Sequence, residues 1–199
     1  MKIPKYVKKM RKQLKKVAKS LGKRGLSSGV RSSVSQRLDP DRYQVTPQGI
    51  YLRKTKKKMI VTVDSAGNPI YDRYGWRPSD DLPLHLAVYQ ARGDVNSIIH
   101  AHPPYLSALS LAVDKLDSAL LPDSLQILGA KLKVDDLDPE IGETSVSLLN
   151  ALTNGNIVLL PRDGVLAVGR SLDYVYTQLD QMEHDAQVFT IARAADLLS

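Results

Sequence analysis

Asn96-Ser97-Ile98-Ile99-His100-Ala101-His102-Pro103-Pro104 is the stretch on which the interpretation of the whole chain depends. Residues 96–102 predict a β-strand, and the two prolines predict that it ends there and that a helix follows over about 104–113. Alternate residues of a strand point to the same face, so the two imidazoles emerge together at the strand end. Two nitrogens placed in this way can bind one divalent cation. The pattern alone leaves open a pair of surface or core histidines.

The sequence on either side alternates between short strands and helices. Apolar periodicity and turn residues predict the elements that follow. Strands are expected at 33–35, 43–45, 58–63, 157–160 and 165–168, turns at 46–49, 65–68 and 161–164, and helices at about 81–92, 143–153 and 172–198. Residues 120–134 supply apolar side chains without a clear element. Strands with interspersed helices indicate an α/β or α+β domain with a central sheet.

Length and composition are those of one globular domain. The chain has 199 residues, of which 43% are hydrophobic and 25% charged, enough to bury a sizeable core. It contains no cysteine, which excludes disulfides and thiolate metal sites, so any metal must be held by imidazole and oxygen. No apolar run approaches the ~20 residues of a membrane span, and no signal peptide is apparent. We therefore expect a cytoplasmic protein without a transmembrane segment.

Positive charge is concentrated at the N-terminus. Residues 1–38 hold 13 Lys and Arg and no Asp or Glu, whereas the remainder holds 15 basic and 21 acidic residues. Apolar residues three or four apart predict an amphipathic helix over 5–21, which Gly22 and Gly25 end. We take residues 1–24 as a basic helix, either part of or appended to a domain over 25–199. Its basic face is either solvated or a surface for a weak anionic partner.

Two further motifs flank the histidine pair in a recognisable order. Residues 77–89 read Arg-Pro-Ser-Asp-Asp-Leu-Pro-Leu-His-Leu-Ala-Val-Tyr, and residues 163–169 read Asp-Gly-Val-Leu-Ala-Val-Gly. The series resembles the class II aldolase/adducin family, which includes fuculose-phosphate aldolase-like enzymes. That family has Pro-Ser-Ser and an acidic residue, a helix with His and Tyr, His-x-His-Pro, and then Asn-His-Gly. The resemblance extends from about residue 10 to the C-terminus and implies a three-layer αβα fold with a mostly antiparallel central sheet.

The resemblance also implies a divalent metal, usually zinc, held by three histidines, with manganese, iron or cobalt as alternatives. Two of the three are His100 and His102, and Asp163 stands where the family has the third. Aspartate can bind these metals through oxygen, so the site can persist with an altered metal preference. The alternatives are that Asp163 is only a turn residue before Gly164, or that the site is degenerate.

The resemblance gives Asp81 the position of the catalytic acid/base. The alternative is that Asp81 caps the helix over 81–92, as Ser79 or Asp80 also could. The residues at the family's phosphate-binding positions are Ser32, Ser33, Gln48, Gly49, Ser79 and Asp80. The negative charge of Asp80 would repel a phosphate, which argues against the usual ketose 1-phosphate as substrate.

The sequence therefore predicts a metal-dependent aldehyde-lyase that cleaves a carbon–carbon bond through a metal-stabilised enediolate. Its substrate would be a small hydroxy-carbonyl compound or a sugar-phosphate-like molecule. The alternatives are an epimerase or decarboxylase at the same site, or a non-catalytic adducin-like binding or scaffold domain. The resemblance further implies a homotetramer with sites near subunit interfaces. We expect His85 to pack in the core and His184 to lie at the surface or in an interface.

Overall fold

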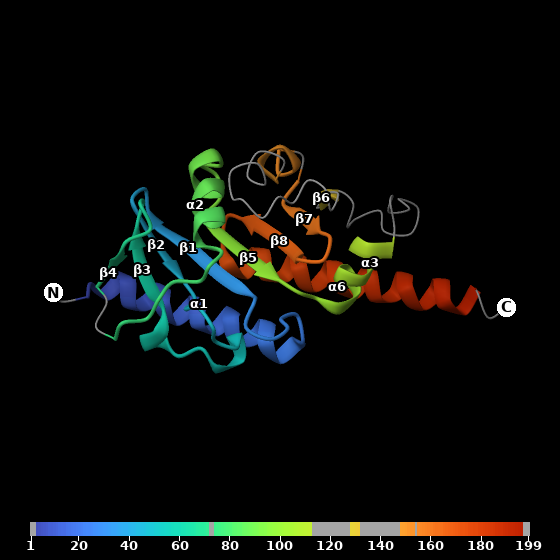
Figure 1. Cartoon of the computed structure of the whole chain (residues 1–199), viewed down its shortest axis with the longest axis horizontal. Helices are drawn as coiled ribbons and strands as arrows, with labels where there is room; N and C mark the ends of the chain where they lie inside the picture. Colours follow the sequence, from blue (N-terminus) through green and yellow to red (C-terminus); the bar gives the residue numbers. More distant parts are fainter. Residues whose placement is uncertain (1–2, 72–73, 113–127, 132–147, 154, 197–199) are drawn as a thin grey trace.

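The architecture is built on one large sheet. The computed structural model describes residues 3–71, 74–112, 128–131, 148–153 and 155–196 (Figure 1). The strands are β1 (Ser33–Asp39), β2 (Arg42–Val45), β3 (Val61–Asp64), β4 (Pro69–Ile70), β5 (Ser97–Ala101), β6 (Leu128–Lys131), β7 (Ile157–Leu160) and β8 (Gly164–Gly169). They form an eight-stranded sheet in the order β4-β3-β2-β1-β5-β8-β7-β6. Every neighbouring pair is antiparallel except β6 and β7.

Strand β5 lies in the middle of this sheet and carries the first histidine of the pair. It is bordered by β1 on one side and β8 on the other, and all five of its residues are buried. Because the pairs are antiparallel, the end of β5 meets the start of both neighbours. His100 is thereby opposite Ser33 of β1 and Leu166 of β8. Residues that lie 67 and 66 positions apart in the chain thus become neighbours at one end of the strand.

Helices cover both faces of the sheet. They are α1 (Lys5–Arg24), α2 (Leu82–Ala91), α3 (Pro104–Ala112) and α6 (Leu172–Asp196), with 3₁₀ turns η1 (Leu52–Lys54) and η2 (Lys57–Met59). Leu14 of α1 and Leu179 of α6 share one core cluster with Ile99, whereas Val88 of α2 shares the other with Ile98. Successive residues of β5 therefore face opposite layers. In Figure 1, α1 and α6 run along the sheet and α2 stands apart from them. The predicted three-layer αβα fold with a mostly antiparallel sheet is confirmed.

Most predicted elements occur, with differences at their ends. The strand predicted over 58–63 is wrong in its first half, because η2 occupies residues 57–59 and β2 pairs only with residues 61–64. Lys57 and Lys58 are exposed there, so no apolar face holds them against the sheet. Strand β1 extends four residues beyond the predicted 33–35. Residues 148–151 of the helix predicted over 143–153 are helical. Residues 143–147, 120–127, 132–134 and 197–198 lie outside the described part of the chain.

Helix α1 packs on the sheet through its apolar stripe. Val7, Leu14 and Leu21 are fully buried, and the buried Arg11 donates to Thr62 Oγ1 of β3 at 2.9 Å. A Cβ on Gly22 would lie 2.6 Å from the backbone nitrogen of Arg53, so α1 approaches η1 as closely as a glycine allows. The outer face is strongly basic. A groove of about 610 Å³ runs along it between Lys9, Lys12, Lys15, Lys16, Lys19 and Lys23. None of the helices in the described residues has the length and apolar character of a membrane span.

Helix α3 begins directly after the histidine pair, and a carboxylate from α6 fixes its start. Glu183 accepts hydrogen bonds from the backbone N–H groups of Tyr105 (3.0 Å) and Leu106 (2.9 Å). These are donors that the first turn of a helix cannot satisfy internally. Burial is the largest influence on the Glu183 carboxyl and raises its pKa, although both N–H groups act in the opposite direction. Glu183 thus caps α3 from another helix and holds the chain that follows His102.

Removal of this cap should destabilise the fold. We expect Glu183→Ala to lower the free energy of unfolding by about 2 kcal/mol, since two buried N–H groups lose their acceptor. Glu183→Gln keeps one acceptor oxygen and should lose about half as much. Urea unfolding followed by circular dichroism measures both. Equal stability of Glu183→Ala and the wild-type chain would show that the cap contributes nothing.

Candidate metal centre

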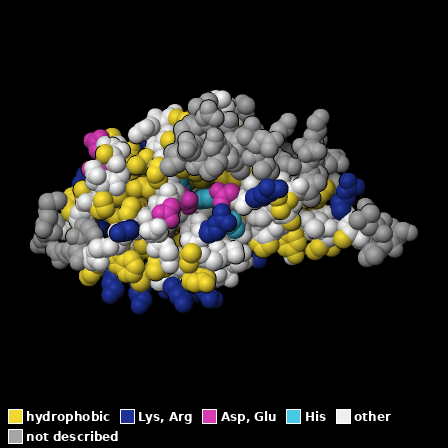
Figure 2. All heavy atoms as spheres, in the orientation of Figure 1, with side chains coloured by type: hydrophobic (Ala, Val, Ile, Leu, Met, Phe, Trp, Pro, Cys, Tyr) yellow, Lys and Arg dark blue, Asp and Glu magenta, His cyan; other side chains and the backbone are white. Residues whose placement is uncertain are grey.

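His100, His102 and Asp163 converge at the end of β5. One ligand atom from each of the three lies within 4.8 Å of the others. His100 Nε2 is 3.7 Å from Asp163 Oδ2, and His102 Nε2 is 3.7 Å from Asp163 Oδ1. Both rings therefore face the same carboxylate. Figure 2 shows histidine and acidic side chains side by side near the centre of one face, next to basic side chains. The structure brings together all three residues that the sequence selected as ligands.

The turn between β7 and β8 places Asp163. Its N–H donates to the carbonyl of Leu160 at 2.9 Å, and the next residue, Gly164, has φ +84°. A Cβ on Gly164 would lie 2.2 Å from the carbonyl oxygen of Ala101 and 3.0 Å from the His102 ring. Only glycine fits there, both because of its positive φ and because β5 passes so close. The turn and the strand end are thereby locked together.

The unsatisfied Nε2 of His102 fits a cation. His102 Nε2 is buried and has no hydrogen-bond partner among the described residues, while its Nδ1 lies 3.2 Å from the hydroxyl of Ser32. A buried polar atom without a partner costs free energy that a ligand would recover. His100 Nε2 is 2.7 Å from the backbone oxygen of Asp163, and its Nδ1 faces Asp81. Two imidazoles and one carboxylate form a donor set that suits zinc and also iron or manganese.

Asp163 is ionised and forms an ion pair with Arg31. Arg31 Nη2 lies 2.8 Å from Asp163 Oδ1, and both side chains are substantially exposed. Burial is the largest influence on the Asp163 pKa and raises it, but His102, His100 and Arg31 together lower it below its usual value. The carboxylate is therefore available as a ligand at neutral pH. No local pattern in the sequence predicts this pairing, because the two residues lie 132 positions apart.

Asp81 faces His100, one of the candidate ligands, and does not cap its own helix. It is the N-cap residue of α2, yet its side chain makes no capping hydrogen bond. Asp81 Oδ2 accepts a hydrogen bond of 2.5 Å from Ser33 Oγ and lies 3.1 Å from His100 Nδ1. Burial acts to raise the pKa of Asp81, but His100, His85 and Ser33 outweigh it and hold the pKa well below its usual range. An ionised carboxylate beside the far nitrogen of a metal-binding histidine orients that ring.

A buried polar chain continues from Asp81 through the interface between β1 and α2. Ser33 Oγ lies 3.3 Å from His85 Nε2, and His85 Nδ1 lies 2.8 Å from Ser35 Oγ. Ser35 Oγ is in turn 2.8 Å from the hydroxyl of Tyr89. His85 is fully buried, and this burial lowers its pKa to about 4, against a smaller opposing effect of Asp81. The ring is therefore neutral, with one nitrogen donating and the other accepting. His85 packs in the core as expected, but within a polar chain that sequence reasoning missed.

The six residues at the expected phosphate-binding positions separate into two groups. Ser32 and Ser33 contact His102 and Asp81 as described above. The other four lie at the Thr46–Gly49 turn and the segment joined to it by the bridge between Pro47 and Pro78. Gln48 Nε2 donates to both carboxylate oxygens of Asp80, at 2.7 and 2.9 Å. Ser79 Oγ lies 3.5 Å from Asp81 Oδ2, and Gly49 has φ +70°. Gln48, Ser79 and Asp80 line a cavity of about 490 Å³. Their role in binding phosphate stays a prediction.

Comparison with known proteins gives consistent relatives. Residues 12–190 match the model of the class II aldolase and adducin N-terminal domain. The 3-oxo-tetronate 4-phosphate decarboxylase of Haemophilus influenzae is 29% identical over 83% of this chain and 80% of its own length. The L-fuculose phosphate aldolase of Methanococcus maripaludis is 29% identical over 80% of this chain and 84% of its own. The crystal structure of YgbL from Escherichia coli, a candidate aldolase, epimerase or decarboxylase, aligns with a TM-score of 0.79 at 22% identity. The alignment covers 94% of this chain and 91% of the YgbL chain.

Gly164→Ala should destabilise the protein and damage the ligand cluster together. We expect a loss of about 3–5 kcal/mol, because strain at positive φ adds to a clash with the Ala101 carbonyl. Gly29→Ala is the matched control, since Gly29 has φ +57° but no atom within 4 Å of the added Cβ, and it should lose about 1 kcal/mol. Thermal unfolding measures the two losses. Equal losses would show that the close approach at Gly164 has no energetic role.

His85 should make folding stability depend on pH. Its folded-state pKa of about 4 lies below its ordinary value of 6.5, so the unfolded chain takes up a proton first as pH falls. The stability contributed by neutral His85 is complete above pH 6.5 and is lost towards pH 4, by about 3 kcal/mol at most. His85→Gln should flatten the unfolding free energy over this interval, whereas His184→Gln, at the exposed surface, should not. Identical pH profiles for wild type and His85→Gln would contradict this prediction.

Proposed function

The chain belongs to the class II aldolase and adducin N-terminal domain family, and on that premise we propose that it is a metal-dependent lyase. It would cleave a carbon–carbon bond next to the carbonyl of a small hydroxy-carbonyl compound and release an aldehyde. One observation carries the proposal. Two imidazoles and the Asp163 carboxylate converge within 4.8 Å, and the ionised Asp81 stands 3.1 Å behind one of those imidazoles.

The ligand set defines what the protein would hold. His100 and His102 would bind a divalent cation through Nε2, which in His100 would give up its contact with the Asp163 backbone oxygen, and Asp163 would bind the cation through a carboxylate oxygen. Zinc is the first choice. Manganese, iron and cobalt are alternatives, because an oxygen ligand makes the site less selective among divalent metals. A cation held there polarises a carbonyl and stabilises negative charge that develops beside it. The side chain of Ser32 would hold the ring of His102 through Nδ1, as Asp81 holds that of His100.

Asp81 would move the proton. Ser33 and His100 both contact its Oδ2, and no described residue donates to its Oδ1. That oxygen is free to accept a hydroxyl proton from the substrate and to return a proton to the carbon left after cleavage. The neutral His85 and Ser33 would keep the carboxylate in place without adding charge.

A decarboxylase at the same site is the second candidate. Aldol cleavage and decarboxylation both break a bond to the carbon next to a carbonyl and leave the electron pair on that carbon. They differ in the fragment that leaves, an aldehyde or carbon dioxide. The similarity to the decarboxylase of Haemophilus influenzae favours this candidate, as the similarity to the aldolase of Methanococcus maripaludis favours the first. A non-catalytic scaffold would have no use for a buried His102 Nε2 without a partner.

Metal content and product analysis test the proposal. Wild-type protein dialysed against zinc should bind about one ion per chain, His100→Ala/His102→Ala should bind none, and Asp163→Ala should bind at least about 10-fold more weakly. Asp163→His should keep zinc and discriminate more strongly against manganese. The zinc-loaded protein is then given L-fuculose 1-phosphate, with aldehyde detected enzymatically, and 3-oxo-tetronate 4-phosphate, with carbon dioxide detected.

Asp81→Asn is the variant that separates catalysis from metal binding. At saturating zinc it should keep the metal and lower kcat by about 10²–10⁴-fold, since an amide cannot accept the proton. Asp94→Asn is the matched control, because Asp94 is an exposed carboxylate paired with Arg92 before the start of β5, and its kcat should change little. A wild-type chain that binds neither zinc nor manganese, or that is metal-loaded yet releases no product from either compound, would contradict the proposal and favour a binding domain.

A further inference from the structure

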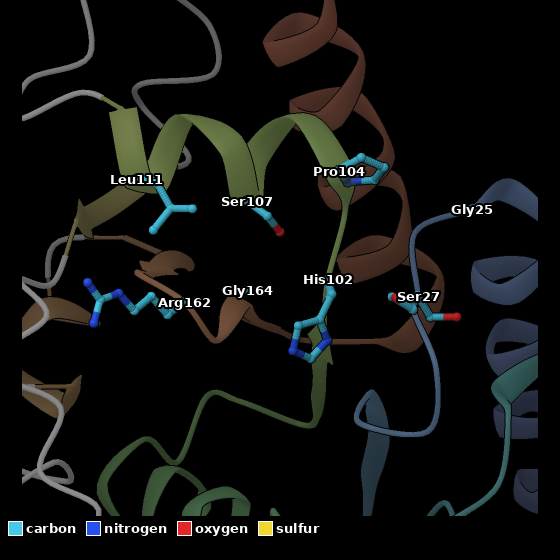
Figure 3. A pocket seen from close by; sticks show the side chains of 9 residues that line it. Gly25, Ser27, His102, Pro104, Ser107, Leu111, Arg162 and Gly164 are labelled. Atoms are coloured by element: carbon cyan, nitrogen blue, oxygen red, sulfur yellow. The ribbon is translucent and has the colours of Figure 1, made fainter.

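A second cavity opens beside the metal ligands, and no residue predicted for phosphate binding lines it. Its volume is about 530 Å³, and His102 and Gly164 form part of its wall. Figure 3 shows the cavity between helix α3 above, the Arg162–Gly164 turn below and the chain near Ser27 at its far side. Its size is that of a small-molecule site. It is separate from the cavity at Gln48 and Asp80, with which it shares no described lining residue.

The walls of this cavity offer one cation and several hydroxyl groups. Arg162 is the only Lys or Arg among the described lining residues, and no Asp or Glu is among them. The hydroxyl groups come from Ser27, Ser28 and Ser107. Ser107 Oγ is buried without a hydrogen-bond partner among the described residues, and Figure 3 shows it pointing from α3 into the space above His102. A buried hydroxyl left unsatisfied favours a ligand that completes its hydrogen bonds.

Arg162 lies at the third position of the tight turn that the Asp163 N–H closes on the Leu160 carbonyl. Its φ is +66°, in the left-handed region that asparagine and glycine adopt far more readily. The side chain is exposed, and it forms no hydrogen bond or ion pair with the described residues. The turn requires this positive φ, and arginine adopts it at a cost of about 1 kcal/mol relative to glycine, although the turn itself needs no guanidinium group. Because Asp163 follows directly, the same turn fixes Arg162 relative to the metal ligands.

We propose that this cavity binds the end of the substrate remote from the cleaved bond, and that Arg162 binds an anionic group there. The inference rests on the proposed function and names its substrate class: an acyclic hydroxy-carbonyl compound with a terminal carboxylate or phosphate. A guanidinium matches either group with paired hydrogen bonds. The cavity at Gln48 is less suitable for an anion, because the Asp80 carboxylate is part of its wall. The hydroxyl groups of Ser27, Ser28 and Ser107 would bind the substrate's own hydroxyl groups.

Binding of small unreactive probes tests the inference separately from catalysis. Isothermal titration calorimetry is run on the zinc-loaded protein with D-glycerate, glycerol 3-phosphate and uncharged glycerol. We expect the wild type to bind one of the anions more tightly than glycerol. Arg162→Asn should weaken the binding of that anion by about 10- to 100-fold. Asparagine is compatible with positive φ, so this variant should fold at least as stably as the wild type. Arg162→Lys keeps the positive charge but not the paired hydrogen-bond donors, and it should lose less anion affinity than Arg162→Asn.

Arg77→Asn is the matched control, because it removes an exposed cation from the wall of the other cavity. It should leave the affinity for the anions unchanged. Which of glycerate and glycerol 3-phosphate depends on Arg162 identifies the terminal group as carboxylate or phosphate. Equal affinities in wild type and Arg162→Asn, or a loss in Arg77→Asn alone, would overturn the inference. If the protein takes up no zinc but still loses affinity in Arg162→Asn, the proposed function fails and the anion site stands.

Discussion

The contact between Gly164 and the carbonyl of Ala101 is the constraint on which the site depends. A Cβ would lie 2.2 Å from that oxygen, so the start of β8 is pressed against the end of β5 as closely as backbone atoms allow. The residue before the glycine then supplies a carboxylate to both histidines. Antiparallel pairing on the other side of β5 supplies Ser33, which holds Asp81. Strand register therefore positions His100 and Ser33, and the tight turn before β8 positions Asp163 beside them.

How much of the fold and of the candidate site can be predicted from the sequence depends on how far apart in the chain the interacting residues lie. Residues 96–104 carry the strand, its end and the paired histidines within nine positions, so local periodicity is sufficient to predict them. Asp163 could be selected only through the resemblance, because nothing near it marks it as a ligand. The contact between Arg31 and Asp163 and the chain from Asp81 to Tyr89 depend on which strands become neighbours. That information is contained in the packing of the whole domain, and no local pattern reveals it.

One local prediction is wrong, and another is confirmed but incomplete. Residues 58–60 have strand-like composition, yet Lys57 and Lys58 are exposed and no strand in the described part of the chain pairs with residues 58–60. His85 lies on an apolar helix face, which indicates core packing, and it is indeed fully buried. Its partners are serines at alternate positions of β1, which face α2 because a strand has a period of two. A burial pattern predicts where a side chain lies, but hydrogen bonds with a distant element decide what it does there.

In the proposed metal site, Asp163 in place of the family's third histidine would change the charge, and two guanidinium groups lie next to Asp163. Three neutral imidazoles leave the full charge of a bound divalent cation, whereas two imidazoles and a carboxylate reduce it by one. A reduced charge polarises a carbonyl less and attracts a substrate anion less. Arg31 lies 2.8 Å from the Asp163 carboxylate, and Arg162 precedes Asp163 in the turn. Two exposed guanidinium groups therefore lie next to Asp163. In the proposed site, the positive charge available to an anionic substrate would thereby shift from the metal to side chains beside it.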